Sequence, residues 1–114
     1  MPPEKVVQDQ LEAYNANNLE KFVSCYCSEI EIHDLDNGRP PIIGIEKLEA
    51  GYKRLFESSP DLESIVQKRI VFDNKVIDHE KVTGINGVDL LECVAIYEVN
   101  DELITHVTFI NKSQ

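Results

Sequence analysis

A carboxylate that shares a strand face with apolar residues is the first candidate for chemistry in this chain. Residues 29–34 read Glu-Ile-Glu-Ile-His-Asp, and side chains in a strand alternate between the two faces of a sheet. Asp34 therefore shares a face with Ile30 and Ile32, which predicts that it points inward. A buried carboxylate is costly unless it is paired, hydrogen-bonded or protonated, so Asp34 is a candidate general base. The alternative is an aspartate that only caps the turn at residues 36–38.

The imidazole of His79 is the second candidate group. By strand parity His79 shares a face with Ile77, and an inward His79 beside Asp34 would form an acid–base pair near neutral pH. The alternative is an outward or half-buried histidine between Asp78 and Glu80. The local sequence leaves both alternatives open.

The same residue types raise the question of a metal site. Histidine and aspartate do bind metals, but adjacent residues in a strand point apart, and no H-x-x-x-H or C-x-x-C spacing occurs. Cys25 and Cys27 are two positions apart, which suits neither a disulfide nor a shared metal ion. The chain also has no glycine-rich phosphate loop and no G-x-S-x-G elbow. We therefore expect no metal and no cofactor.

Composition narrows the range of partners and locations. The 114 residues carry a formal net charge of −10, with lysine and arginine scattered along the chain. Nucleic acids and anionic membranes bind basic surfaces, so neither is an expected partner. No run approaches the roughly 18 apolar residues of a membrane helix, and the N-terminal residues contain no signal-peptide core. The prediction is a cytoplasmic protein of one domain, residues 1–114, whose cysteines are small apolar residues of a reducing compartment.

Hydrophobic periodicity predicts the elements that position these groups. Apolar residues at helical spacing indicate two short helices before residue 29 and a third over residues 45–58. A turn-rich segment at residues 35–41 and a short edge strand at 42–43 precede that third helix. Further strands joined by tight turns are expected at 62–72, 76–83, 89–99 and 103–111. Helices and strands segregated in this way predict an α+β fold, in which a curved antiparallel sheet wraps around helices.

This order of elements resembles the nuclear transport factor 2-like superfamily, which includes the SnoaL-like polyketide cyclases and the ketosteroid isomerases. The resemblance spans essentially the whole chain. It is carried by the Tyr-Asn-Ala-Asn-Asn-Leu junction at residues 14–19, the strand at 29–34, the Pro-Ile-Ile-Gly-Ile-Glu helix start at 41–46, and residues 76–80 and 103–109. It implies a cone, in which a strongly curved antiparallel sheet closed by three helices surrounds a deep apolar pocket.

In the isomerase branch, the resemblance implies that the residue at the position of Asp34 is the general base. The tyrosine and the aspartic acid of the isomerase oxyanion hole fall on Gln10 and Ala95 here, so that hole is not reproduced. Tyr14 lies one helical turn beyond Gln10, and its hydroxyl is expected to reach the same pocket. The expected catalytic residues are therefore Asp34, His79 and Tyr14. The expected pocket lining is Gln10, Tyr52, Phe56, Ile77, Leu91, Cys93, Ala95, Val107 and Phe109.

The expected function is binding of a mainly apolar small molecule, with Asp34 removing a proton next to a carbonyl. The outcome would be isomerisation or cyclisation, or the addition and loss of water. The alternative is a ligand-binding or protein-interaction module without catalysis, because one fold hosts many functions. The opposite sheet face carries branched apolar residues, and members of the superfamily are commonly homodimers. We expect a homodimer through this face, formed by Val94, Ile96, Ile104 and Ile110.

Overall fold

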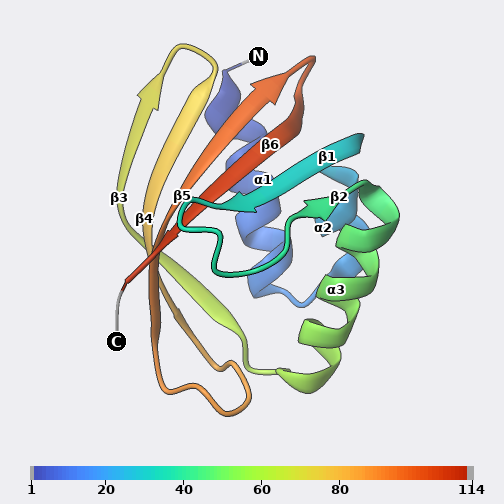
Figure 1. The fold of residues 1–114 in the computed structure, drawn as a ribbon, viewed down its shortest axis with the longest axis vertical. Coiled ribbons are helices and arrows are strands. Elements are labelled where there is room, and N and C mark those ends of the chain that lie inside the picture. Colours follow the sequence, from blue (N-terminus) through green and yellow to red (C-terminus); the bar gives the residue numbers. More distant parts are fainter. Residues whose placement is uncertain (1, 113–114) are drawn as a thin grey trace.

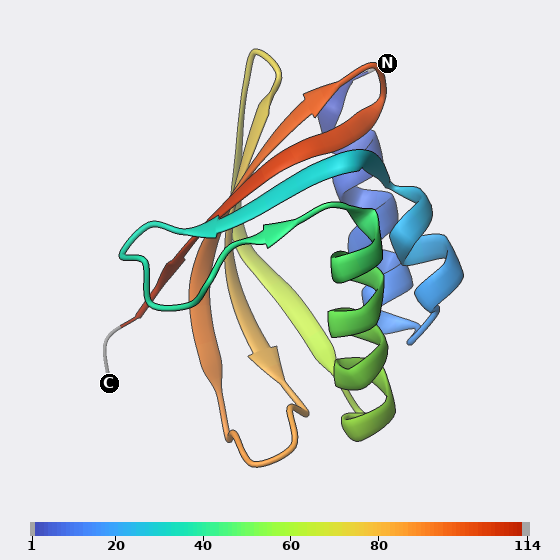
Figure 2. The same ribbon diagram turned by 45° about the vertical axis from the view of Figure 1, so that its right-hand side comes forward.

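All three helices lie against one side of a strongly curved sheet (Figures 1 and 2) in the computed structural model, which describes residues 2–112. The elements, in chain order, are α1 (Pro3–Asn15), α2 (Leu19–Ser24), β1 (Tyr26–Asp34), β2 (Ile42–Ile43), α3 (Ile45–Ser58), β3 (Glu63–Phe72), β4 (Lys75–Thr83), β5 (Leu91–Asn100) and β6 (Leu103–Asn111). The predicted α+β class and the predicted order of elements are confirmed. The first strand begins earlier than expected, at Tyr26.

The six strands form one sheet in the order β2-β1-β6-β5-β4-β3. The last four strands of the chain are sequential antiparallel neighbours, whereas β1 pairs with β6 in parallel. This parallel pairing sets Asp34 directly beside Phe109. The end of the first long strand and the end of the last strand therefore meet at one place in the sheet.

The helices bury one face each against the concave side of the sheet. Asn18 caps α2, because its side-chain oxygen accepts a hydrogen bond from the backbone N–H of Lys21 at 3.1 Å. Fully buried residues of the helices include Val7 of α1 and Leu48 of α3, and Phe22 of α2 is 1% exposed. None of the helices within residues 2–112 is long and apolar enough to cross a membrane.

The inward and outward side chains of strand β4 are the reverse of those expected from Ile77. Its buried residues are Val76, Asp78, Glu80 and Val82. Ile77 and His79 therefore point to the outer face of the sheet, and the expected inward placement of both is wrong. Lysine is almost never fully buried, and Lys75 and Lys81 lie on the same face of the strand as His79. These two lysines therefore indicate that this face, with His79, points outward.

A β-bulge near the turn between β5 and β6 changes the expected placement of Ile104. Glu98 pairs with His106 and Val99 pairs with Ile104, so Thr105 is an extra residue in β6. One extra residue reverses the alternation of side chains along a strand. Ile104 is consequently fully buried in the core of its own chain, and its expected place on the outer face is wrong.

Candidate functional site

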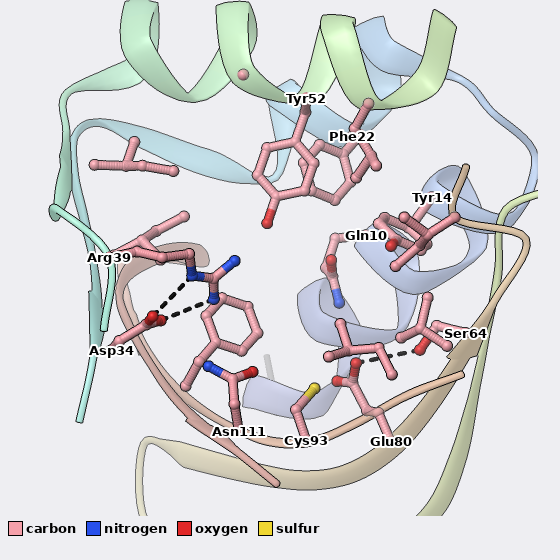
Figure 3. Close-up of a pocket in the computed structure, with 18 of the residues that line it drawn as sticks. Gln10, Tyr14, Phe22, Asp34, Arg39, Tyr52, Ser64, Glu80, Cys93 and Asn111 are labelled. Carbon is pink, nitrogen blue, oxygen red and sulfur yellow. Dashed lines mark hydrogen bonds and ion pairs between the residues drawn. The ribbon is translucent and has the colours of Figure 1, made fainter. Parts of the chain in front are cut away.

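A cavity of about 490 Å³ opens between the concave face of the sheet and the helices (Figure 3). Aromatic rings from all three helices line it: the ring centroid of Phe22 lies 4.6 Å from that of Tyr52 and 6.0 Å from that of Tyr14. Polar side chains face the cavity at a few separate points. A mainly apolar cavity of this size with a few polar groups is typical of a small-molecule site.

Asp34 lies at one side of this cavity and pairs with Arg39. Arg39 Nε and Nη2 donate to the two carboxylate oxygens at 2.7 and 2.8 Å, the two-pronged geometry of a strong arginine–carboxylate pair. The side chain of Asp34 is 8% exposed and that of Arg39 is 63% exposed. The hydrogen bond from Arg39 lowers the pKa of Asp34; burial opposes this, and the charge of Arg39 and the side chain of Asn111 lower the pKa further. Asp34 is therefore a weaker base than an unpaired aspartate.

Glu80 faces the cavity from β4, across from Asp34 (Figure 3). It is 6% exposed, and its two carboxylate oxygens accept hydrogen bonds from Ser64 Oγ and from the Tyr97 hydroxyl, both at 3.2 Å. Burial raises the pKa of Glu80 to about 7, the charge of Asp78 adds to the rise, and the two hydrogen bonds oppose it. This carboxyl group is therefore able to gain or lose a proton near neutral pH.

A chain of buried hydrogen bonds extends from Glu80 to helix α1. The Tyr97 hydroxyl, which donates to Glu80, accepts a hydrogen bond from Gln10 Nε2 at 3.2 Å. The Tyr26 hydroxyl donates to Gln10 Oε1 at 3.1 Å. Burial raises the pKa of Tyr26 and of Tyr97, so both hydroxyls remain protonated donors. Hydrogen-bonded networks of this kind hold their members in one arrangement.

An ion pair lies next to Glu80 on the same face of β4. Arg69 Nε and Nη2 donate to the carboxylate of Asp78 at 2.7 and 2.9 Å, and Arg69 Nη1 donates to Gln8 Oε1 at 2.9 Å. Asp78 is fully buried and does not line the cavity. The pair joins β3, β4 and α1, and the charge of Asp78 raises the pKa of Glu80.

The sequence pattern that defines the SnoaL-like domain family matches residues 7–107. This chain belongs to the SnoaL-like domain family. The match covers most of the chain and confirms the expected resemblance. Among curated proteins, none matches this SnoaL-like domain in sequence.

Solved structures share the fold of this SnoaL-like domain at low sequence identity. An uncharacterised cystatin-fold protein from Novosphingobium aromaticivorans superposes with a TM-score of 0.87 at 20% identity, over 96% of this chain and 98% of that one. A candidate ketosteroid isomerase from Kribbella flavida gives 0.84 at 16% identity, over 98% and 78%. An LEH-like epoxide hydrolase from M. tuberculosis gives 0.82 at 13% identity, over 96% and 82%. These similarities establish the fold and leave the reaction to be argued from the site.

The cavity of this SnoaL-like domain brings together two of the three expected catalytic residues. Asp34 and Tyr14 line it, and burial raises the pKa of Tyr14, which keeps its hydroxyl neutral. His79 lies on the outer face, where its Nε2 is 2.6 Å from Glu92 Oε2. The expected lining residues that border the cavity are Gln10, Tyr52, Leu91, Cys93 and Phe109. Phe56, Ala95 and Val107 are buried but do not border the cavity, and Ile77 is on the outer face.

Sequence reasoning missed Glu80 and Arg39. Glu80 lies on the same face of β4 as Val76 and Val82, and these two valines were the sequence signal that Glu80 points inward. Arg39 lies in the turn-rich segment at residues 35–41, and no sequence pattern indicated that it pairs with Asp34.

Within residues 2–112, no three histidine, cysteine, aspartate or glutamate side chains are placed to hold a metal ion. Burial raises the pKa of Cys93 to about 12, so its thiol is protonated and a poor nucleophile.

Proposed function

We propose that this SnoaL-like domain binds a mainly apolar small molecule and moves a proton between two of its carbon atoms. The observation that supports this most strongly is the carboxyl group of Glu80, which faces a mainly apolar cavity and has a pKa raised to about 7. Groups that transfer protons work best when their pKa lies near the working pH. At neutral pH, Glu80 is present in both forms, so the same side chain can accept a proton and return it.

The reaction that this arrangement supports is isomerisation of a carbonyl compound. The Glu80 carboxylate removes a proton from the carbon next to the carbonyl, and the electron pair of the broken C–H bond moves onto the carbonyl oxygen to give an enolate. In a conjugated enolate, the protonated Glu80 then returns that proton to a different carbon. Substrate and product have the same composition, so no co-reactant is needed. The neutral Tyr14 hydroxyl adds a hydrogen-bond donor to the cavity wall.

In this proposal Glu80 takes the role of base that the sequence suggested for Asp34. Arg39 lowers the pKa of Asp34, whereas burial raises the pKa of Glu80. The group with the higher pKa holds a proton more tightly and is the stronger base. Each unit of pKa difference corresponds to about a tenfold difference in proton affinity.

Exchange of carbon-bound hydrogen for deuterium tests the proposal. β-Tetralone, a neutral bicyclic ketone with acidic hydrogens beside its carbonyl, is incubated with the protein in heavy water and followed by proton NMR. We expect wild type to accelerate exchange, and Glu80→Gln to reduce that acceleration by on the order of a hundredfold, because general bases contribute about that much or more. The matched control is Glu98→Gln, which removes a glutamate from the outer face. Binding of β-tetralone without faster exchange would contradict catalysis and favour a non-catalytic ligand-binding domain.

A homodimer through the outer face of the sheet is a second proposal. Val94 pairs with Ile110, and Ile96 pairs with Ile77, which in turn pairs with Ile70. These five residues share the outer face of the sheet, which no helix of the described chain covers (Figure 2). Ile70 is exposed and the other four are half-buried, and apolar sheet faces left partly open to solvent commonly mark an interface. A second copy fits, because a two-fold axis sets the same surface against itself.

A further inference from the structure

Hydrogen-bond donors of Arg39 and Tyr52 face the cavity and are not used by the buried network. Resting on the proposed function, we infer that Arg39 Nη1 and the Tyr52 hydroxyl together bind the carbonyl oxygen of the ligand. Arg39 donates to Asp34 through Nε and Nη2. The remaining guanidinium nitrogen and the Tyr52 hydroxyl point toward the same space inside the cavity (Figure 3).

Aromatic contacts hold the ring of Tyr52 in place, and its hydroxyl remains available to a ligand. The ring packs against Phe22 at 4.6 Å and against Tyr14 at 6.5 Å between centroids. Burial raises the pKa of Tyr52 to about 12, so the hydroxyl remains a protonated donor. Among the hydrogen bonds of residues 2–112, none involves this hydroxyl. A donor that faces a cavity without a protein partner gains a hydrogen bond when a ligand brings an acceptor.

Asp34 determines the direction of the arginine. Both of its oxygens accept hydrogen bonds from Arg39, and its own side chain is 8% exposed, so a nearly buried carboxylate anchors an arginine whose side chain is 63% exposed. Pro40 and Pro41 follow directly and restrict the backbone of the loop that carries the arginine. Asp34 is therefore a positioning residue, because it orients Arg39 and Arg39 contacts the ligand.

The charges indicate a neutral ligand with a carbonyl group. Arg39 and Asp34 cancel each other as a pair, and the net charge of −10 disfavours the approach of anions. Two converging donors fit the oxygen of a ketone, ester or lactone, and they stabilise the negative charge that develops on that oxygen when a neighbouring proton leaves. Glu80 lies on the other side of the cavity (Figure 3). An apolar carbonyl compound lying between them would present its oxygen to the donors and its C–H bond to Glu80.

Two probes of nearly equal shape test this site. Methyl β-naphthyl ketone carries a carbonyl oxygen, and β-isopropenylnaphthalene has a methylene group in its place. The measured quantity is the ratio of their dissociation constants, obtained from naphthalene fluorescence. We expect the preference for the ketone to fall by on the order of tenfold in Tyr52→Phe and in Arg39→Met, which is the usual effect of losing one such hydrogen bond.

Two further variants make the comparison specific. Asp34→Asn should lower the ketone preference although Arg39 is still present, because the arginine loses the carboxylate that orients it. A general loss of stability would weaken the binding of both probes and would not change the ratio of their dissociation constants. Arg54→Met removes an exposed arginine from α3 and should leave the ratio at the wild-type value.

The outcomes distinguish a failure of the oxygen site from a failure of the proposed function. If both probes bind and the ratio is the same in wild type, Tyr52→Phe and Arg39→Met, the oxygen site is wrong while proton transfer by Glu80 still stands. A fall in Tyr52→Phe alone overturns the part assigned to Arg39. If neither probe binds wild type, the cavity does not accept apolar carbonyl compounds, and both the inference and the proposed function fail.

Discussion

Glu80 and Asp34 face one cavity from opposite sides, and their surroundings shift the pKa values of their carboxyl groups in opposite directions. Burial raises the pKa of Glu80 to about 7, while the hydrogen bonds from Arg39 lower that of Asp34. At neutral pH, one carboxyl group exchanges a proton and the other is a permanent partner for a cation. A pair of carboxyl groups divided in this way is the usual arrangement for separate acid–base and electrostatic roles.

The first prediction concerns the pH dependence of stability. The pKa of Glu80 is 4.5 in an ordinary setting and about 7 in the folded protein, so the folded state binds the proton more tightly and gains up to about 3 kcal/mol. This stabilisation is fully present below about pH 4.5 and is lost as the pH rises through about 7. Urea unfolding at about pH 5 and about pH 8 should show a larger loss of stability in wild type than in Glu80→Gln. Parallel losses in the two proteins would show that Glu80 has an ordinary pKa.

The second prediction concerns the hydroxyl of Tyr97. Its hydrogen bond lowers the pKa of Glu80, so Tyr97→Phe should raise that pKa further and move the pH midpoint of β-tetralone exchange upward. The ring remains in place, which limits the structural change to one oxygen atom. Tyr14→Phe removes a hydroxyl of the same cavity that is not bonded to Glu80, so it should leave the midpoint unchanged even where it slows the exchange. Equal midpoints for wild type and Tyr97→Phe would contradict the role of the network.

The third prediction concerns the ion pair of Arg69 and Asp78. The side chain of Asp78 is 1% exposed, so Arg69→Met leaves a buried carboxylate without its cation and should destabilise the fold by about 3 kcal/mol. The double variant Arg69→Met with Asp78→Leu removes both charges and should recover much of that loss, because a buried pair replaced by apolar residues is often tolerated. Chemical denaturation of the three proteins measures both effects. A double variant as unstable as the single one would contradict this explanation.

The fourth prediction concerns the outer face of the sheet. Ile96→Glu places a charge in the middle of the proposed interface, so the protein should become monomeric at concentrations where wild type is a dimer. Light scattering after size exclusion measures the mass of each. Leu90→Glu, which places the same charge on the exposed loop between β4 and β5, should remain dimeric. A monomeric wild type would show that this face does not bind a second copy of the chain.

The fold was predictable because its signals are local. The helix at residues 45–58 was expected from apolar residues at helical spacing, and the structure has α3 at the same residues. The strands after it were expected from alternation and turn residues, and β3 to β6 pair in chain order. Patterns of this kind depend on neighbouring residues and do not require knowledge of distant contacts.

The site was only partly predictable because its contacts are not local. Ile30 and Ile32 indicated the inward face of β1, and the structure places Asp34 at the cavity. The direction of Arg39 depends on the shape of a proline-containing loop, which no periodicity specifies. Glu80 was missed because a strand with two inward carboxyl groups is unusual, and such a strand forms only when an arginine and two hydroxyls from other elements satisfy those groups.

The most direct measurement of the central claim is a carbon NMR titration of isotope-labelled glutamate carboxyl groups. The Glu80 signal is assigned by its absence from the spectrum of Glu80→Gln. We predict a titration midpoint near pH 7 and a shift of this signal when methyl β-naphthyl ketone binds, while the signal of Glu98 on the outer face does not move. A midpoint near the ordinary glutamate value of 4.5, with no response to the ketone, would contradict proton transfer by Glu80.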